Sequence, residues 1–202
     1  MSIQAVIFDI GGVLSVYHDF EAYFKWEQQL ELPKMQLLKI IYDNPVSRQA
    51  TLGEATVSDV WEEVGRQLEL PPDELHKLQE EIWNGYRWNT ELLDFIRSLK
   101  PDYKVGILSD AWADARESMG DVVNKELFDA IVFSAEEGLQ KPDPGLFQCA
   151  IERLGVKPAE AILLDDREAN IQGAKEFGMH GVHFTETNKA IEDIKALLQN
   201  SD

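Results

Sequence analysis

A short apolar run near the start of the chain, residues 3–8, ends in one aspartate and is followed closely by two glycines. The run shows no polar alternation, which predicts a strand buried on both faces of a sheet. Its carboxylate, Asp9, would then stand at the carboxyl end of a buried strand, where α/β proteins bind ligands. Gly11 and Gly12 leave backbone N–H groups free to approach an anion closely. We therefore expect Asp9 to be a nucleophile or a metal ligand, the alternative being an ordinary turn built from Asp and Gly.

Composition and charge limit the class of protein and its partners. The 202 residues include 37 acidic and 19 basic ones, and the formal net charge is −18. Such a surface repels nucleic acid and anionic lipid, so neither is an expected partner. The sequence has no apolar run of bilayer length and no secretory signal at its start, which predicts a cytoplasmic protein. The one cysteine, Cys149, falls in the stripe of a predicted helix, so we expect a packed thiol rather than a nucleophile.

Residues 17–86 are helical in pattern, and we expect no strand among them. The clearest apolar stripe occupies positions 57, 60, 61, 64 and 68, which is the spacing of an amphipathic helix. Residues 56–59 before it are a plausible capping box, and a further helix is expected from Pro71 to about Trp83. A long helical segment placed directly after the Asp9 loop predicts an insertion that folds over that loop.

From residue 90 the pattern changes to alternating helices and strands. Strands are expected at residues 103–108, 130–133, 161–164 and 181–184, and helices at residues 91–99, 113–120, 144–154, 169–177 and 189–198. This alternation predicts an α/β fold with a doubly wound, mostly parallel sheet. We expect a core domain of residues 1–15 and 88–202, with a small all-helical cap of residues 16–87 inserted after the first strand.

Polar residues stand where the predicted strands end, and a doubly wound sheet collects such residues at one edge. Ser109 and Asp110 follow the second strand, Lys141 lies beyond the third, and Asp165 and Asp166 follow the fourth. Carboxylates are ligands suited to Mg²⁺, while a lysine and a serine supply donors for phosphoryl oxygens. With the aspartate of the first strand as nucleophile, this set predicts phosphoryl transfer through an aspartyl-phosphate, acting on a small phosphorylated metabolite.

Four motifs in this order resemble those of the haloacid dehalogenase (HAD) superfamily of hydrolases. Residues 8–14 (FDIGGVL) are similar to its first motif, residues 108–110 (LSD) to its second, residues 141–144 (KPDP) to its third and residues 164–171 (LDDREANI) to its fourth. The resemblance implies a Rossmann-like core, a helical cap and Mg²⁺ as cofactor.

The resemblance also implies roles for individual residues. It makes Asp9, Ser109 and Lys141 catalytic, adds Asp110 and Gly11 to the phosphate-binding group, and assigns the metal to Asp9, the backbone carbonyl of Gly11, Asp165 and Asp166. Asp166 either binds a water of the metal or orients Lys141, and these two roles stay open. Asn170 either anchors a metal-bound water or caps its helix. For Asp110, we favour capping of nearby backbone.

One position departs from the family's phosphatases, which carry a second aspartate two residues after the nucleophile. Gly11 stands there in this chain. The protein is therefore a phosphatase that lacks this acid, a dehalogenase, whose leaving halide needs no proton, or a protein that binds a phosphorylated ligand without turnover. The variant is similar to that of bacterial sugar-1-phosphate phosphatases, which favours the first reading. His18 and Asp19 are candidates to replace the missing group.

Trp88 and Trp112 lie near the predicted cap hinge and just after Ser109. They could line the crevice, but we favour packing in the core for both. The sequence leaves the oligomeric state open between a monomer and a homodimer.

Overall fold

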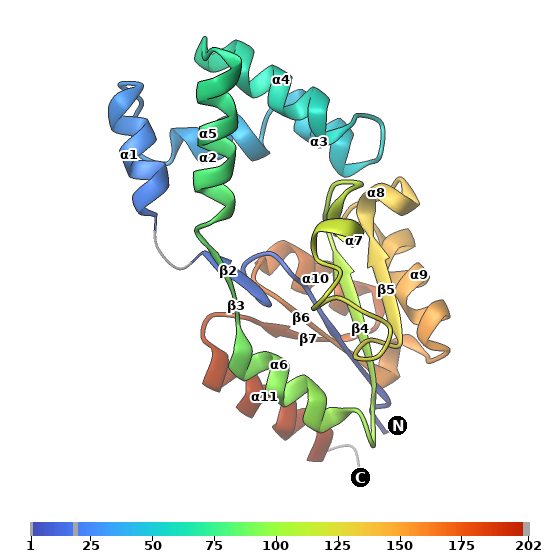
Figure 1. Cartoon of the computed structure of the whole chain (residues 1–202). Coiled ribbons are helices and arrows are strands. Elements are labelled where there is room, and N and C mark those ends of the chain that lie inside the picture. The colour runs from blue at the N-terminus through green and yellow to red at the C-terminus, as the bar shows by residue number, and fades with distance from the viewer. Residues whose placement is uncertain (1, 18–19, 200–202) are drawn as a thin grey trace.

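The computed structural model describes residues 2–17 and 20–199. Its centre is a five-stranded sheet in the order β5-β4-β1-β6-β7 (Figure 1). The strands are β1 (Ala5–Phe8), β4 (Lys104–Ser109), β5 (Ala130–Phe133), β6 (Ala161–Asp165) and β7 (His180–His183). Every pairing within this sheet is parallel. The prediction of a doubly wound parallel sheet is confirmed.

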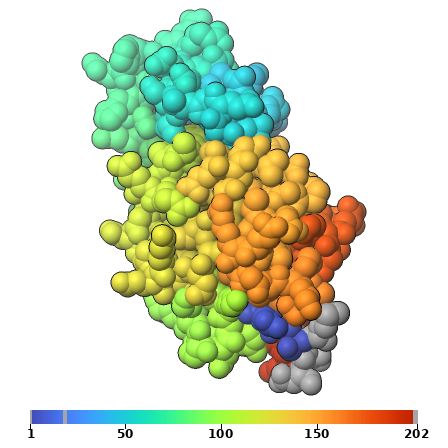
Figure 2. Space-filling view, turned by 90° about the vertical axis from the view of Figure 1, so that its right-hand side faces the viewer, coloured from blue at the N-terminus to red at the C-terminus, as the bar shows by residue number. Residues whose placement is uncertain are grey.

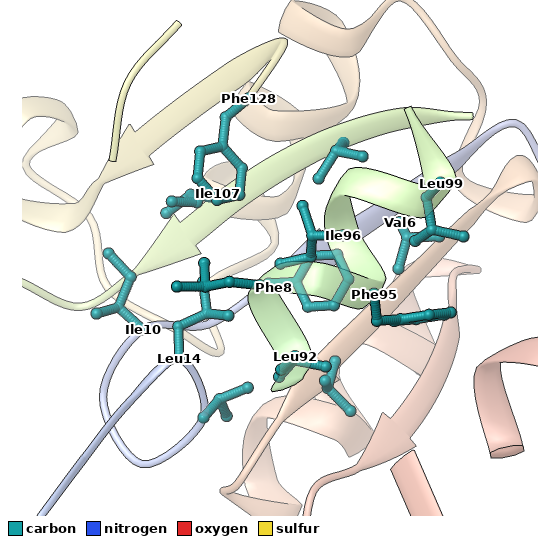
Figure 3. Packing of buried hydrophobic residues seen from close by; sticks show 14 of the residues in the cluster. Val6, Phe8, Ile10, Leu14, Leu92, Phe95, Ile96, Leu99, Ile107 and Phe128 are labelled. Carbon is teal, nitrogen blue, oxygen red and sulfur yellow. The ribbon is translucent and has the colours of Figure 1, made fainter. Parts of the chain in front are cut away.

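Helices cover both faces of the sheet because the inner strands are apolar on both sides. The helices α6 (Thr90–Leu99) and α11 (Thr187–Gln199) pack on one face, and α9 (Pro144–Leu154) and α10 (Glu168–Phe177) pack on the other. Each face of the sheet carries a hydrophobic cluster, and the side chains of β1 alternate between the two. Phe8 packs on the α6 and α11 face with Leu92 and Ile96 (Figure 3). Ile7 packs on the α9 and α10 face with Phe147. Full burial of β1 explains why its sequence lacks polar alternation.

The strand order places β1 between β4 and β6, with later strands added outward on both sides. Because all five strands are parallel, their carboxyl ends share one edge of the sheet. In folds of this kind the crevice for ligands opens at that edge, where the strand order reverses. Asp9 follows β1 at this point.

The helices that lie between β1 and α6 in the chain have a hydrophobic cluster of their own. They are α1 (Glu21–Gln29), α2 (Gln36–Tyr42), α3 (Pro45–Thr51), α4 (Val57–Leu68) and α5 (Pro72–Trp83), and we call them the cap. Their cluster includes Tyr23, Leu37, Val60 and Trp61. The expected capping box at the start of α4 is formed in both directions. Figure 2 shows the cap seated on one end of the core.

Two short strands connect the cap with the core, and sequence reasoning missed both. The strands β2 (Ser15–Tyr17) and β3 (Tyr86–Trp88) pair in antiparallel register, with Ser15 opposite Trp88 and Tyr17 opposite Tyr86. The expectation that residues 17–86 contain no strand is therefore wrong at both ends. Three residues are too few to display the two-residue period that identifies a strand.

The segment after β4 is less helical than expected, since only α7 (Ala115–Ser118) forms within residues 113–120. The remaining short elements are α8 (Ser134–Glu137) and the 3-10 helix η1 (Pro158–Glu160). Within the described residues, the helices are too short or too polar to cross a membrane.

Candidate active site

Asp9 lies directly after β1 and is 6% exposed. Its backbone N–H still donates to the Leu164 carbonyl, 2.9 Å away, so the residue is held by the sheet. The Ile10 N–H donates to Oδ1 of Asp9 at 2.7 Å, which fixes the orientation of the carboxylate. Burial raises the pKa of Asp9 to about 6; Lys141 opposes this rise, the neighbouring Asp165 adds to it, and a hydrogen bond from Ser109 also opposes it.

Lys141 is the cation of the site and is 3% exposed. Its Nζ lies 2.6 Å from Oδ2 of Asp165 and 3.0 Å from Oδ2 of Asp9, and it donates to the Leu108 carbonyl at 3.1 Å. Burial acts to lower the pKa of Lys141, but the two carboxylates outweigh it, and the pKa is raised above its usual value. A charged ammonium is therefore shared between the ends of β1 and β6.

Asp165 is fully buried and accepts hydrogen bonds at both carboxylate oxygens. The Arg167 N–H and the Asn170 amide each donate to Oδ1 at 2.9 Å, and the Asn170 amide also lies 3.1 Å from Oδ2. Asn170 thus orients Asp165, whereas we expected it to cap the helix or anchor a water. The sequence left open whether Asp166 orients Lys141. In the structure Asp165 makes this contact.

Asp166 is the exposed member of the acidic pair. Its carboxylate lies against Gly12, where an added Cβ would overlap it, and Gly12 has a positive φ of 75°. Carboxylate oxygens of Asp9, Asp165 and Asp166 lie within 4.8 Å of one another. Three hard oxygen donors at this separation suit a divalent cation such as Mg²⁺.

The loop after β4 supplies the remaining polar groups. Ser109 ends the strand, is 2% exposed and hydrogen-bonds to Asp9. Asp110 accepts the backbone N–H of Lys141 at 2.9 Å, so it caps backbone as favoured above and fixes the loop that carries the lysine. Burial raises the pKa of Asp110, while the charge of Lys141 opposes the rise.

Gly11 is exposed, and apart from Gly11 itself and its two chain neighbours no described residue has an atom within 4 Å of the position that its Cβ would take. As far as the described residues go, the space normally filled by a side chain at this position is open. The two proposed replacements for the missing acid, His18 and Asp19, lie outside the described residues. Cys149 is half-buried beside the α9 and α10 cluster, in line with a packed thiol.

Sequence reasoning missed Ser134, which is completely buried at the start of α8. Its Oγ accepts the Ala111 N–H at 2.9 Å and lies 3.1 Å from the Ala111 carbonyl, to which it donates. It thereby clamps the loop that follows Ser109. The available signal was a serine placed directly after a predicted buried strand.

Comparison with known proteins agrees with this geometry. The family model of haloacid dehalogenase-like hydrolases matches residues 3–178. The chain belongs to this family. Among the curated relatives, acyl-CoA dehydrogenase family member 10 of Mus musculus is 29% identical over 98% of this chain, which spans only 19% of that protein. Two phosphatases match over most of both chains, each at 25% identity: the sesquiterpene phosphatase astK of Aspergillus oryzae (96% of this chain, 96% of that protein) and the phosphorylated carbohydrates phosphatase of Thermotoga maritima (97% and 90%).

Solved HAD structures share the fold. A predicted HAD-like hydrolase from Porphyromonas gingivalis superimposes with a TM-score of 0.76 at 22% identity, covering 98% of this chain and 99% of its own. A HAD family enzyme from Bacteroides thetaiotaomicron, solved with magnesium and inorganic phosphate, has a TM-score of 0.73 at 21% identity and covers 91% and 95%. At these identities the likeness establishes the fold alone. Together with the family match and the phosphatase relatives, it identifies this protein as a HAD-type hydrolase.

Proposed function

We propose that the protein is a Mg²⁺-dependent hydrolase of small phosphomonoesters that works through an aspartyl-phosphate. The observation that carries this proposal is the grouping of Asp9, Ser109 and Lys141 at one sheet edge, beside the acidic pair after β6. A carboxylate flanked by an ammonium and a hydroxyl can attack phosphorus while both donors hold its oxygens. The two phosphatase relatives, and the neighbour solved with magnesium and phosphate, support it.

The charges of the site favour a divalent cation. Three carboxylates surround one ammonium, so a phosphate dianion would enter a negative field without further positive charge. Asp9, Asp166 and the carbonyl of Gly11 would hold Mg²⁺, and Asp165 would contribute an oxygen or keep its bond with Lys141. Bound there, Mg²⁺ would neutralise charge on the phosphoryl group.

The chain's own groups account for the remaining steps. The Ile10 N–H holds the Asp9 carboxylate in position for attack. Ser109 and Lys141 bind phosphoryl oxygens as the bond to the leaving alcohol breaks, and water then cleaves the aspartyl-phosphate. Gly11 brings no acid at the position that the family's phosphatases use, so protonation of the departing alkoxide is not assisted from there, which favours esters of acidic alcohols.

The decisive experiment measures phosphate release from a panel of phosphomonoesters, with Mg²⁺ and with EDTA. We expect release that requires Mg²⁺ and is abolished by Asp9→Asn. Asp94→Asn is the matched control because this aspartate is exposed on α6 and pairs with Arg97 of the same helix. Release that persists unchanged in Asp9→Asn, or no release from any ester, would reject the proposal.

Dehalogenation is the second candidate, and Gly11 is the observation that favours it. Displacement of halide from carbon by Asp9 requires no leaving-group acid and no metal. The three clustered carboxylates argue against it, because that chemistry has no use for a metal site. Chloride release from 2-chloropropionate in the presence of EDTA would establish this alternative. If neither phosphate nor chloride is released, the remaining interpretation is a protein that binds a phosphorylated ligand without turnover.

A further inference from the structure

A row of aromatic side chains runs from the hinge between cap and core to the loop after Ser109. We call it the aromatic wall, and it consists of Phe20, Tyr17, Tyr86, Tyr42 and Trp112. Neighbours in the row are in direct contact. The ring of Tyr17 lies 5.0 Å from that of Phe20 and 4.7 Å edge-on from that of Tyr86, and the rings of Tyr42 and Trp112 stack at 5.6 Å. The hydroxyls of Tyr42 and Tyr86 are hydrogen-bonded at 3.1 Å.

One end of this wall is fixed close to the phosphoryl site. Trp112 is three residues after Ser109, so their Cα atoms are at most about 11 Å apart. The loop between them is rigid, because Ser134 clamps Ala111 through both backbone groups and Asp110 binds the N–H of Lys141. The backbone that leads to Trp112 therefore has a defined position relative to the groups that would hold phosphate.

The cap supplies the other side of this contact. Tyr42 ends α2 and stacks on Trp112, which belongs to the core. A second contact lies at the end of α3, where the backbone of Gly53 approaches the Ala135 carbonyl of α8 so closely that a Cβ would not fit. Figure 1 shows α3 directly above α7 and α8. With the cap in this position, the wall joins the cap to the loop that follows Ser109.

The chemistry of the wall selects an apolar group. All five residues are partly exposed and pack against the hydrophobic cluster of the cap, and none is charged at neutral pH. The hydroxyls of Tyr42 and Tyr86 already bond to each other, which reduces their capacity to pair with the hydroxyls of a sugar. Apolar surface beside a polar binding site marks a place where an apolar ligand part is buried.

We infer that the aromatic wall is the specificity surface of the proposed phosphatase site and selects phosphoesters of apolar, ring-containing or branched alcohols over sugar phosphates. This inference rests on the proposed function and adds the substrate class to it. Phosphate is held at the strand ends, and the alcohol lies against Trp112 and Tyr42. Both residues bind substrate and neither takes part in the chemical step.

Calorimetric titration with two phosphonates, which cannot be hydrolysed, tests this inference without turnover. Phenylphosphonate and methylphosphonate are compared in the presence of Mg²⁺, with inorganic phosphate as reference. In the unmodified protein we expect phenylphosphonate to bind at least about tenfold more tightly, because its ring is buried against the wall. In Trp112→Ala the ratio of the two affinities should fall below about three. Phe177→Ala is the matched control, because this half-buried aromatic packs on Phe147 at the end of α10 and should keep the ratio.

The outcomes separate the two proposals. Equal affinities in the unmodified protein, or equal losses for both ligands in Trp112→Ala, overturn the wall as a specificity surface and leave the phosphatase proposal standing. If neither phosphonate nor phosphate binds, both proposals fail. Tyr42→Ala tests the cap side of the contact should Trp112→Ala not fold, and the ratio in the unmodified protein needs no variant.

Discussion

Substituting Gly11 by aspartate should convert a slow phosphatase into a faster one for esters of ordinary alcohols. The structure accepts this change, because the position is exposed, its φ is not positive and no described atom beyond the chain neighbours lies within 4 Å of the new Cβ. The new carboxyl would stand two residues after the nucleophile and could protonate the departing oxygen. General acid help of this kind is worth about 10²–10⁴-fold in rate.

Repulsion between the new carboxylate and the carboxylates already in the site limits how much of this rate increase is obtained. A carboxylate about 6 Å from another one is opposed by about 0.7 kcal/mol in a water-like medium and about 3 kcal/mol at the effective dielectric of a protein surface. Because Gly11 is exposed, the lower figure applies, and the repulsion also raises the pKa of the new acid toward neutral pH. We expect an increase in kcat of about 10²-fold for alkyl phosphates and little change for p-nitrophenyl phosphate, whose leaving group needs no acid.

The assay is kcat for a series of phosphomonoesters plotted against the pKa of the leaving alcohol. The plot should be steep for the unmodified protein and flatter for Gly11→Asp. Gly11→Asn controls for shape without a transferable proton, and Gly12→Ala, which overlaps the Asp166 carboxylate, should lose activity. A flat plot for the unmodified protein, or the same gain in Gly11→Asn, would refute the reasoning.

Three further predictions concern stability and can be checked by urea denaturation. Lys141→Ala leaves two buried carboxylates facing each other and should cost about 3–5 kcal/mol; a loss below 1 kcal/mol would contradict the shared ammonium. Gly53→Ala should cost about 1–3 kcal/mol, because φ is 75° and the Cβ meets the Ala135 carbonyl; an unchanged protein would show that this cap contact is loose. Burial raises the pKa of Asp129, but a hydrogen bond from Lys100 and one from backbone outweigh it and the pKa lies below 3.8. The stabilisation that the Asp129 carboxylate provides is therefore present above pH ~4 and is lost as pH falls through the folded pKa. We expect Asp129→Asn to cost under about 1 kcal/mol at pH 7 and less at pH 3. A cost that does not depend on pH would exclude this ion pair as its source.

The core was predictable because its strands are buried runs separated by clearly periodic helices. The expected bounds agree with the structure for β5 and α9 and differ by one or two residues for β1, β4, β6 and β7. The hinge strands β2 and β3 were not predictable, because each is three residues long. Their pairing joins positions 15–17 to 86–88 across the whole cap, and no local pattern encodes such a contact.

The candidate site divides in the same way. Asp9, Ser109 and Lys141 were predictable from their places after strands, and the structure brings their side chains together. The different contacts of Asp165 and Asp166 were not predictable, because adjacent residues at a strand end point in different directions. Which one meets Lys141 depends on packing around Asn170, from the next helix. The stacking of Tyr42 on Trp112 joins residues 70 positions apart and is likewise a product of the folded chain.

The antiparallel pairing of β2 with β3 has a consequence for how such a molecule can be altered. The chain leaves the core and returns to it at facing residues, Tyr17 and Tyr86, so the two ends of the cap are neighbours in space. A tight turn could join them without disturbing the parallel sheet, and a different helical segment could be attached at the same two points. The cap is thus connected like an exchangeable module, and it could be redesigned while the polar groups at the strand ends keep their positions.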